Sequence, residues 1–177
     1  NELTLSSLER LAEQTGSWHE AASRYDAEVQ KMREESPEEV AHLAKRSAVI
    51  NEVQLDDIDA AISRYQFVVD VDSADADAIE ALDRLYEQTE RWDDLAATLQ
   101  MEAAIATTPE DVLNLQFRTG QVFQNQLGNM DSAIAQYREI IAAAPEYSPA
   151  VSALEDLFSS GVRPLEIGEV LEPLYRM

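Results

Sequence analysis

The chain repeats itself, and this repetition constrains its fold more than any other feature of the sequence. Residues 8–25 (LERLAEQTGSWHEAASRY) and 82–99 (LDRLYEQTERWDDLAATL) are identical at eight of 18 aligned positions, which include the two tryptophans, Trp18 and Trp92. A shift of 72 residues then aligns 36–99 with 108–171 without a gap. Self-similarity of this kind is typical of proteins built from stacked supersecondary units. The sequence therefore predicts a repeat array that occupies the whole chain.

Apolar periodicity and capping residues indicate that the repeating units are helical. Apolar residues recur at i, i+3, i+4 and i+7 in most of the chain, and no segment has the pattern of a strand. Ser36-Pro37 and Thr108-Pro109 each place an N-cap residue before a proline at the first helical position. We expect ten helices, near residues 4–14, 18–33, 37–53, 57–70, 76–88, 92–106, 109–126, 130–143, 149–159 and 164–172.

The end of the chain reads PLEIGEVLEPLYRM. A proline inside a helix costs roughly 3 kcal/mol, so Pro173 is expected to lie in the first turn of a further helix. Neither end carries a polar cap and the chain lacks an initiator methionine. We therefore expect a segment of a larger, bacterial protein, whose last helix is exposed in isolation or pairs with another copy.

Residues 127–145, LGNMDSAIAQYREIIAAAP, resemble the second half of a tetratricopeptide repeat. The residues that match this motif are Gly128, Ala133, Tyr137, Ile140 and Pro145. The resemblance implies an all-α fold, a right-handed superhelical α-solenoid of about five hairpins, with about ten helices and the start of another. It implies a single solenoid over 1–177, with repeats at about 3–35, 36–74, 75–107, 108–147 and 148–172, and 173–177 as the start of a further helix.

Small and aromatic residues at matching positions of the repeats are expected to hold neighbouring hairpins together. A small residue lets two helices approach closely, and an aromatic ring fills the gap to the next hairpin. The expected repeat-core anchors are Trp18, Ala61, Tyr65, Trp92, Gly120, Gly128, Ala133 and Tyr137.

The net charge of the chain limits the classes of partner that it is expected to bind. The sequence has 35 acidic and 13 basic residues, a net charge of −22. Binding of DNA, RNA or anionic lipid needs lysine and arginine to neutralise phosphate, so neither nucleic acid nor a membrane is expected as a partner. A basic protein would be attracted instead. The alternative is that the charge only keeps the protein soluble. Without cysteine or a visible signal peptide the compartment stays open, and a cytoplasmic location is favoured for the fragment.

No group of residues has the pattern of a catalytic or metal site. The acidic run Asp70–Asp77 fails as a calcium loop, because Ala74, Asp75 and Ala81 occupy its fifth, sixth and twelfth positions. His19 and His42 lie on different hairpins and lack the partners of a zinc site. No phosphate-binding glycine loop or catalytic triad is visible. We predict no enzyme, no cofactor and no bound metal.

The resemblance also implies that the first helices of the hairpins line a concave groove that binds a peptide or a partner helix. The lysine–asparagine set that clamps C-terminal carboxylates in some tetratricopeptide repeats is missing. The candidate groove residues are Arg10, Lys45, Arg46, Arg84 and Arg118. They could contact a partner, or pair with neighbouring acids of the same chain. The function predicted is a protein-interaction scaffold. A ligand-responsive regulatory domain and a structural, self-associating spacer are the alternatives.

Overall fold

The computed structural model describes residues 2–32 and 37–176, with side chains for 7–32 and 39–176, and all regular structure in this part of the chain is α-helical. The helices are α1 (Glu2–Thr15), α2 (Trp18–Met32), α3 (Pro37–Val53), α4 (Ile58–Val71), α5 (Ala76–Gln88), α6 (Trp92–Ile105), α7 (Pro109–Asn125), α8 (Met130–Ala143), α9 (Ser148–Ser159) and α10 (Pro164–Tyr175). The ten helices predicted by residue range are all found, with their ends within three residues of the prediction. The all-α helical-repeat fold is confirmed. Among the described residues, none of the helices is both long and apolar enough to span a membrane.

Polar caps set several of the helix starts. The Thr108 hydroxyl accepts the backbone N–H of Asp111 at 3.1 Å and so caps α7, as the sequence predicts. Asp57 and Asn129 cap α4 and α8 in the same way. Such caps satisfy backbone N–H groups that have no partner within the helix. The predicted cap at Ser36 lies outside the described residues.

The helix predicted to start at Pro173 is not found, and this prediction is wrong. Helix α10 continues through Pro173 to Tyr175. A proline removes the hydrogen bond to the carbonyl four residues earlier. Only the last turn of α10 is affected, and the apolar contacts on both sides of the proline hold that turn in place. Leu171 is buried, and Leu174 packs against the same hydrophobic cluster.

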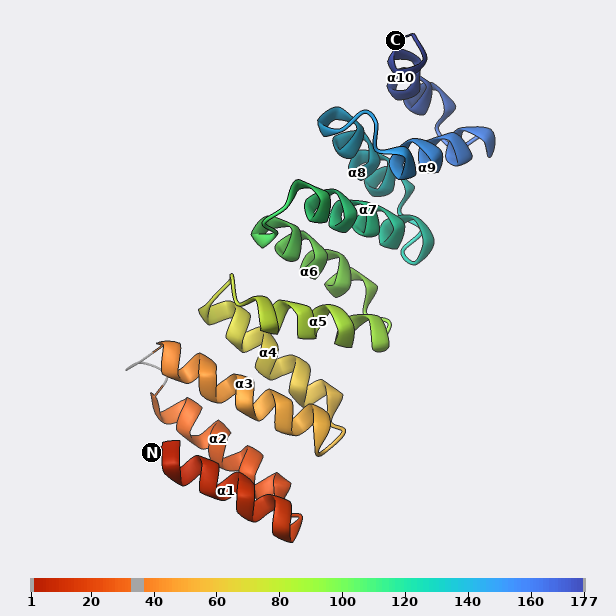
Figure 1. Cartoon of the computed structure of the whole chain (residues 1–177). Helices are drawn as coiled ribbons and strands as arrows, with labels where there is room; N and C mark the ends of the chain where they lie inside the picture. Colours follow the sequence, from red (N-terminus) through yellow and green to blue (C-terminus); the bar gives the residue numbers. More distant parts are fainter. Residues whose placement is uncertain (1, 33–36, 177) are drawn as a thin grey trace. The chain divides into compact units, whose positions relative to one another are not determined.

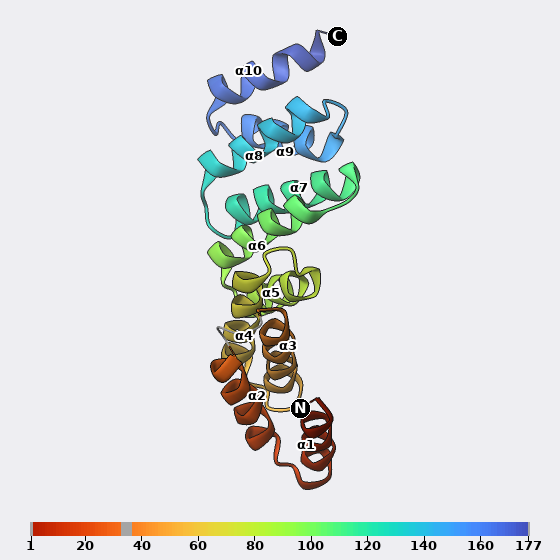
Figure 2. The ribbon, with the colours of Figure 1, turned by 90° about the vertical axis from the view of Figure 1, so that its left-hand side faces the viewer.

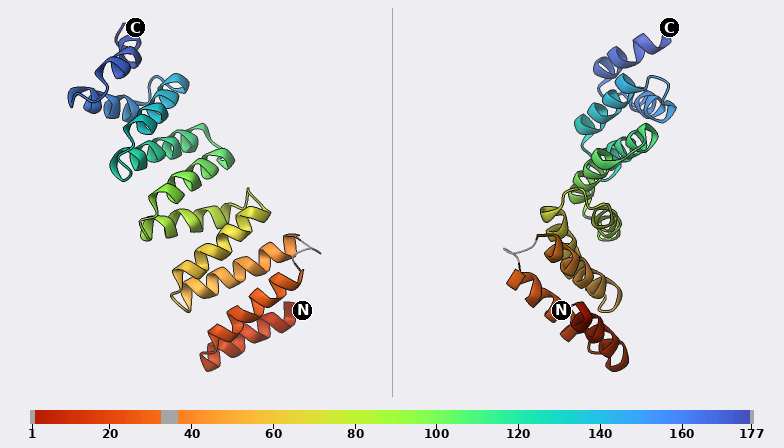
Figure 3. Two further views of the ribbon diagram at one scale, coloured as in Figure 1. Left: turned by 180° about the vertical axis from the view of Figure 1, so that it is seen from behind. Right: turned by 60° about the vertical axis from the view of Figure 1, so that its left-hand side comes forward.

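The helices divide into two compact units, Asn1–Thr89 with α1–α5 and Glu90–Met177 with α6–α10. We call them unit 1 and unit 2. Within each unit every helix packs against the next one in the chain, as Figure 1 and the views from other sides in Figure 3 show. The boundary between the units falls inside the predicted repeat 75–107. The single solenoid over 1–177 stays a prediction.

Most of the expected anchor residues are buried in these units. Ala61, Ala133 and Tyr137 are fully buried, Tyr65 nearly so, and Gly120 is packed under the ring of Tyr137. Trp18 lies at the edge of a cluster formed by α1, α2 and α3, and Trp92 is partly exposed at the start of α6.

Gly128 does not fit the expected role of a core anchor. It is exposed in the turn between α7 and α8, and its φ is 62°. Glycine adopts this left-handed backbone conformation without the penalty of a Cβ atom. Its position in the motif therefore reflects the geometry of the turn.

The helices of unit 1 form two layers. Figure 2 shows α1 and α3 on one side of the unit and α2 and α4 on the other. Ion pairs from α3 to residues 75, 77 and 84 place α5 beside α3. The first helices of successive hairpins, α1, α3 and α5, thus present neighbouring surfaces.

Candidate functional site

The exposed face of α3 is the centre of the candidate site. With 100° between successive residues, His42 and Val49 point along the middle of this face. Lys45 and Glu52 lie on the side of α5, while Arg46 and Val53 lie on the side of α1. Val49 and Val53 are 40% and 64% exposed, which is high for aliphatic side chains. We call the exposed residues Arg10, His42, Arg46, Val49, Val53 and Arg84 the α1/α3/α5 surface.

A cluster of three side chains joins α1, α2 and α3 at one edge of this surface. The Nε atom of Arg46 donates to Glu9 Oε1 at 3.1 Å, and the Tyr25 hydroxyl donates to the same carboxylate. Burial raises the pKa of Tyr25 to about 12, and the Glu9 carboxylate adds to the increase. Arg46 is therefore held over α1 by a carboxylate that a buried tyrosine positions.

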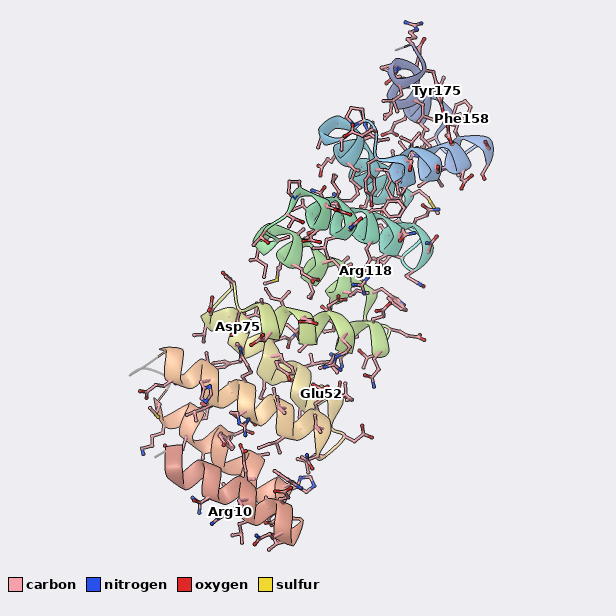
Figure 4. The ribbon with its side chains drawn as sticks, viewed as in Figure 1. Arg10, Glu52, Asp75, Arg118, Phe158 and Tyr175 are labelled. Atoms are coloured by element: carbon pink, nitrogen blue, oxygen red, sulfur yellow. The ribbon has the colours of Figure 1, made fainter. Side chains whose placement is uncertain are left out.

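The same arrangement recurs between α3 and α5. Arg84 Nη2 lies 2.6 Å from Glu52 Oε1, and the Tyr65 hydroxyl donates to Glu52 Oε2 at 3.3 Å. Burial raises the pKa of Tyr65 to about 12, with Glu52 as the second cause. Figure 4 shows Glu52 near the C-terminal end of α3.

Lys45 forms a third link between α3 and α5. Its Nζ donates to Asp75 Oδ1 at 2.7 Å and to Asp77 Oδ2 at 3.1 Å. The Asp75 carboxylate also accepts the backbone N–H of Ala78 at 2.9 Å and so caps α5. Burial alone would raise the pKa of Asp75, but Lys45 and the backbone N–H groups stabilise the carboxylate, and the net result is a lowered pKa.

We expect the Asp75→Ala variant to lose about 1 kcal/mol of folding free energy, because it removes both an N-cap and an ion pair. Asp75→Asn should lose less at neutral pH, since asparagine keeps the cap. Because the pKa of Asp75 is lower in the folded chain than in the unfolded chain, its carboxylate stabilises the fold at pH values above the ordinary aspartate pKa. This stabilisation is lost as the pH falls through the lowered pKa of the folded state. Urea unfolding at neutral and acidic pH should show the difference between wild type and Asp75→Asn vanishing in acid. A difference that is unchanged in acid would contradict this assignment.

Three of the five predicted groove residues, Lys45, Arg46 and Arg84, pair with carboxylates of neighbouring helices. Arg10 is exposed on α1 (Figure 4), where it has no ion-pair partner among the described residues. Arg118 belongs to unit 2 and is partly buried on α7. The sequence left open that these cations pair with acids of the same chain, and this pairing is observed for Lys45, Arg46 and Arg84.

The acidic partners in these pairs were not among the residues predicted from the sequence. Glu9, Glu52 and Asp75 are three of 35 acids, and their partners lie 37, 32 and 30 residues away. A helical wheel of 37–53 could have identified Val53 beside Val49. Nowhere in the described parts of the chain do three or more histidine, aspartate or glutamate side chains form a group that could hold a metal ion.

Comparisons with known proteins agree with this architecture. The family model of the tetratricopeptide repeat matches residues 78–113. A solved structure described as "Crystal structure of MamA protein" is similar with a TM-score of 0.52 and 15% identity, covering 98% of this chain and 93% of that one. A second, "Crystal structure of MamA", has a TM-score of 0.47 and 16% identity, covering 93% and 91%. No curated protein sequence matches. The match at residues 78–113 and the paired helices of both units support an all-α helical-repeat fold of the tetratricopeptide type.

Proposed function

We propose that the chain is a non-enzymatic protein-binding scaffold and that the α1/α3/α5 surface holds a peptide or a partner helix. The observation that carries the proposal is the pair of exposed valines, Val49 and Val53. They lie between the Arg46–Glu9 ion pair on the α1 side and the ion pairs of Lys45 and Arg84 on the α5 side. Tetratricopeptide repeats are in general protein-interaction folds. An apolar strip with polar edges is typical of a surface that seats an extended or helical segment.

The ion pairs at the edges of the surface are weak enough for a partner to replace one member of a pair. Arg46 and Arg84 are about half exposed, and pairs of this kind contribute about 0.2–1 kcal/mol each. A partner that offers a carboxylate or a backbone carbonyl can therefore take over one of these arginines at small cost. The buried tyrosines keep Glu9 and Glu52 in place meanwhile, so little ordering of the scaffold is required.

The net charge of −22 favours a partner that is basic as a whole. Opposite charge steers such a partner toward the protein and raises its association rate, and added salt weakens this effect. The scaffold is thus expected to bind a protein that is basic overall and that places an apolar segment on Val49 and Val53.

We expect the Val49→Glu variant to lose its partner, because a carboxylate at the middle of the surface disrupts apolar contact and adds to the acidic charge. Affinity capture from a lysate of the source organism, at low and high salt, would be run in parallel with wild type and with Val71→Glu. Val71 is the matched control, an exposed valine at the end of α4, on the other layer of unit 1. Mass spectrometry should find a protein depleted about tenfold by Val49→Glu and unchanged by Val71→Glu, which corresponds to about 1.4 kcal/mol.

Equal capture by both variants would overturn the assignment of this surface. If Arg84→Ala binds the captured partner with unaltered affinity, Arg84 does not take part in binding. The assignment of Val49 and Val53 to the binding surface would still stand. Capture of nothing except other copies of the chain would favour the structural, self-associating spacer over a scaffold. A partner enzyme or signalling peptide whose binding changes an attached domain would favour the regulatory alternative.

A further inference from the structure

The exposed groups at the centre of the α1/α3/α5 surface lie along the axis of α3. His42, Val49 and Val53 are spaced i, i+7 and i+11, and all three are exposed. They extend over about 16 Å, or about three turns of helix. Ion pairs join α3 to α1 on one side of this line and to α5 on the other. A segment seated on the valines between these ion pairs therefore runs along α3 and not across it.

The side chains along this line favour a helix over an extended segment. An extended chain loses water from its backbone N–H and C=O groups when it is seated, and each buried group then needs a partner on the scaffold. Val49 and Val53 offer neither a donor nor an acceptor to such groups. A helix makes its backbone hydrogen bonds within itself and presents only side chains. His42, Val49 and Val53 also follow the heptad spacing through which two helices pack side by side.

The end of α3 next to Val53 carries negative charge. Asp56 and Asp57 follow it in the turn to α4, and both are exposed. Asp57 caps α4 through its side chain, whereas Asp56 has no ion-pair partner among the described residues. The C-terminal end of the α3 dipole adds partial negative charge at the same place. A partner helix is therefore stabilised most when its own N-terminus, the positive end of its dipole, lies here, and such a helix is antiparallel to α3.

We propose that the occupant of the α1/α3/α5 surface is an amphipathic helix of a partner protein that lies antiparallel to α3. Its apolar stripe contacts Val49 and Val53, and lysine or arginine just before its first turn faces Asp56. This inference rests on the proposed function for the location of the site and adds the conformation and the direction of the bound segment. A second copy of this chain is a poorer occupant, because each copy carries a net charge of −22.

Photo-crosslinking from the full chain tests the conformation of the bound segment. The photoreactive amino acid p-benzoylphenylalanine would replace His42 in one variant and Val53 in a second, with Val71 on the other layer of unit 1 as the control position. Each variant would be irradiated in a lysate of the source organism, and mass spectrometry would locate the crosslinked residue of the captured protein. Positions 42 and 53 are 11 residues apart on α3. For a seated helix the two crosslinked residues should also be about 11 apart, whereas an extended segment would place them about five apart. In an antiparallel helix the residue reached from position 53 precedes the residue reached from position 42.

A change of charge tests the direction of the helix. Asp56→Asn removes the unpaired carboxylate and keeps a residue that tolerates the left-handed backbone at this position, where φ is 54°. The affinity of the purified chain for the purified crosslinked protein should fall about threefold. Asp70→Asn is the matched control, because it removes an exposed carboxylate at the far end of α4, about 20 Å along that helix. At physiological salt this distance exceeds the screening length, so the affinity should stay unchanged.

The outcomes separate this inference from the proposed function. Crosslinked residues about five apart, or in the same order as positions 42 and 53, would overturn the antiparallel helix and leave the binding surface in place. Equal weakening by Asp56→Asn and Asp70→Asn would likewise overturn the direction. Covalent dimers as the only products would assign the surface to a second copy and would also overturn this inference. If no protein is crosslinked from positions 42 and 53, or if the same protein is crosslinked equally from position 71, the proposed function fails as well. Circular dichroism of each variant checks that its helices are intact.

Discussion

Raising the pH from about 9 to about 12 is expected to unfold the protein, because three buried tyrosines resist ionisation in the folded state. The pKa values of Tyr25, Tyr65 and Tyr137 are raised from 10 to about 12. Burial is the largest cause for each, and carboxylates add to it for Tyr25 and Tyr65. Between the two pKa values the unfolded chain releases its phenolic protons and the folded chain retains them, so the free energy of unfolding falls as the pH rises.

The size of this loss follows from the shifts. One pKa unit corresponds to about 1.4 kcal/mol, so each tyrosine removes about 2 kcal/mol of stability by pH 12. Unit 1 contains Tyr25 and Tyr65, and unit 2 contains Tyr137 together with Tyr147, whose pKa is also raised by burial, so both units should lose stability. The total is comparable to the whole stability of a small domain. Alkaline pH should therefore have a larger effect than any single substitution considered above.

The two tryptophans allow the units to be followed separately, since Trp18 lies in unit 1 and Trp92 in unit 2. Urea midpoints would be measured at about pH 9 and pH 11 in Trp92→Phe and Trp18→Phe backgrounds. Tyr65→Phe removes one titrating hydroxyl of unit 1 and should reduce the alkaline loss reported by Trp18. Tyr137→Phe should do so only for Trp92. Midpoints that do not move between these pH values would contradict the assignment.

The helices of this protein could be predicted because their signals are local. Proline at the first helical position, a capping hydroxyl or carboxylate, and the spacing of apolar residues depend only on neighbours along the chain, as at Thr108 and Pro109. Pro173 was assigned wrongly because its effect depends on tertiary contacts. The packing of Leu171 and Leu174 keeps the last turn of α10 helical across the proline.

The candidate site could be predicted only in part, because its ion pairs join residues that are far apart in the sequence. Arg46 and Arg84 were found because both repeat copies place arginine on the first helix. Their carboxylates were not, because a helical pattern does not say which acid on a neighbouring helix lies opposite. The repeat alignment did contain a signal for the pairing of Glu52 with Arg84, because both residues differ in the other copy. Glu52 and Arg84 of unit 1 correspond to Gln124 and Asp156 of unit 2, so the ion pair seen in unit 1 cannot form between their counterparts.

Gly120 and Phe117 both pack against the ring of Tyr137, and both differ from their counterparts in unit 1. A Cβ atom at Gly120 would lie 2.5 Å from Cε1 of the fully buried Tyr137 ring. Phe117 packs on the same ring, with centroids 5.6 Å apart. In unit 1 the corresponding residues are Ala48 and Lys45, and Lys45 reaches toward Asp75. We infer that Phe117 presses the Tyr137 ring toward residue 120, so that only glycine fits there, whereas Lys45 leaves room for Ala48.

We expect Gly120→Ala to destabilise unit 2 by about 1–2 kcal/mol, because overpacking against a buried ring outweighs the higher helix propensity of alanine. Gly168→Ala in α10 is the matched control. Its Cβ would lie 3.7 Å from the Phe158 ring, an ordinary contact, so this change should stabilise the unit by up to about 1 kcal/mol. Urea unfolding of both variants in the Trp18→Phe background would measure the two opposite signs.

A double-mutant cycle then tests whether Phe117 is the cause of the crowding. Phe117→Leu gives the Tyr137 ring room to move away from residue 120, so Gly120→Ala should cost at least about 1 kcal/mol less in that background than alone. Equal costs in both backgrounds would show that the Tyr137 ring is held by other contacts. A stabilising Gly120→Ala would show that the ring yields freely, in which case the difference between the repeats at this position would not be a packing requirement.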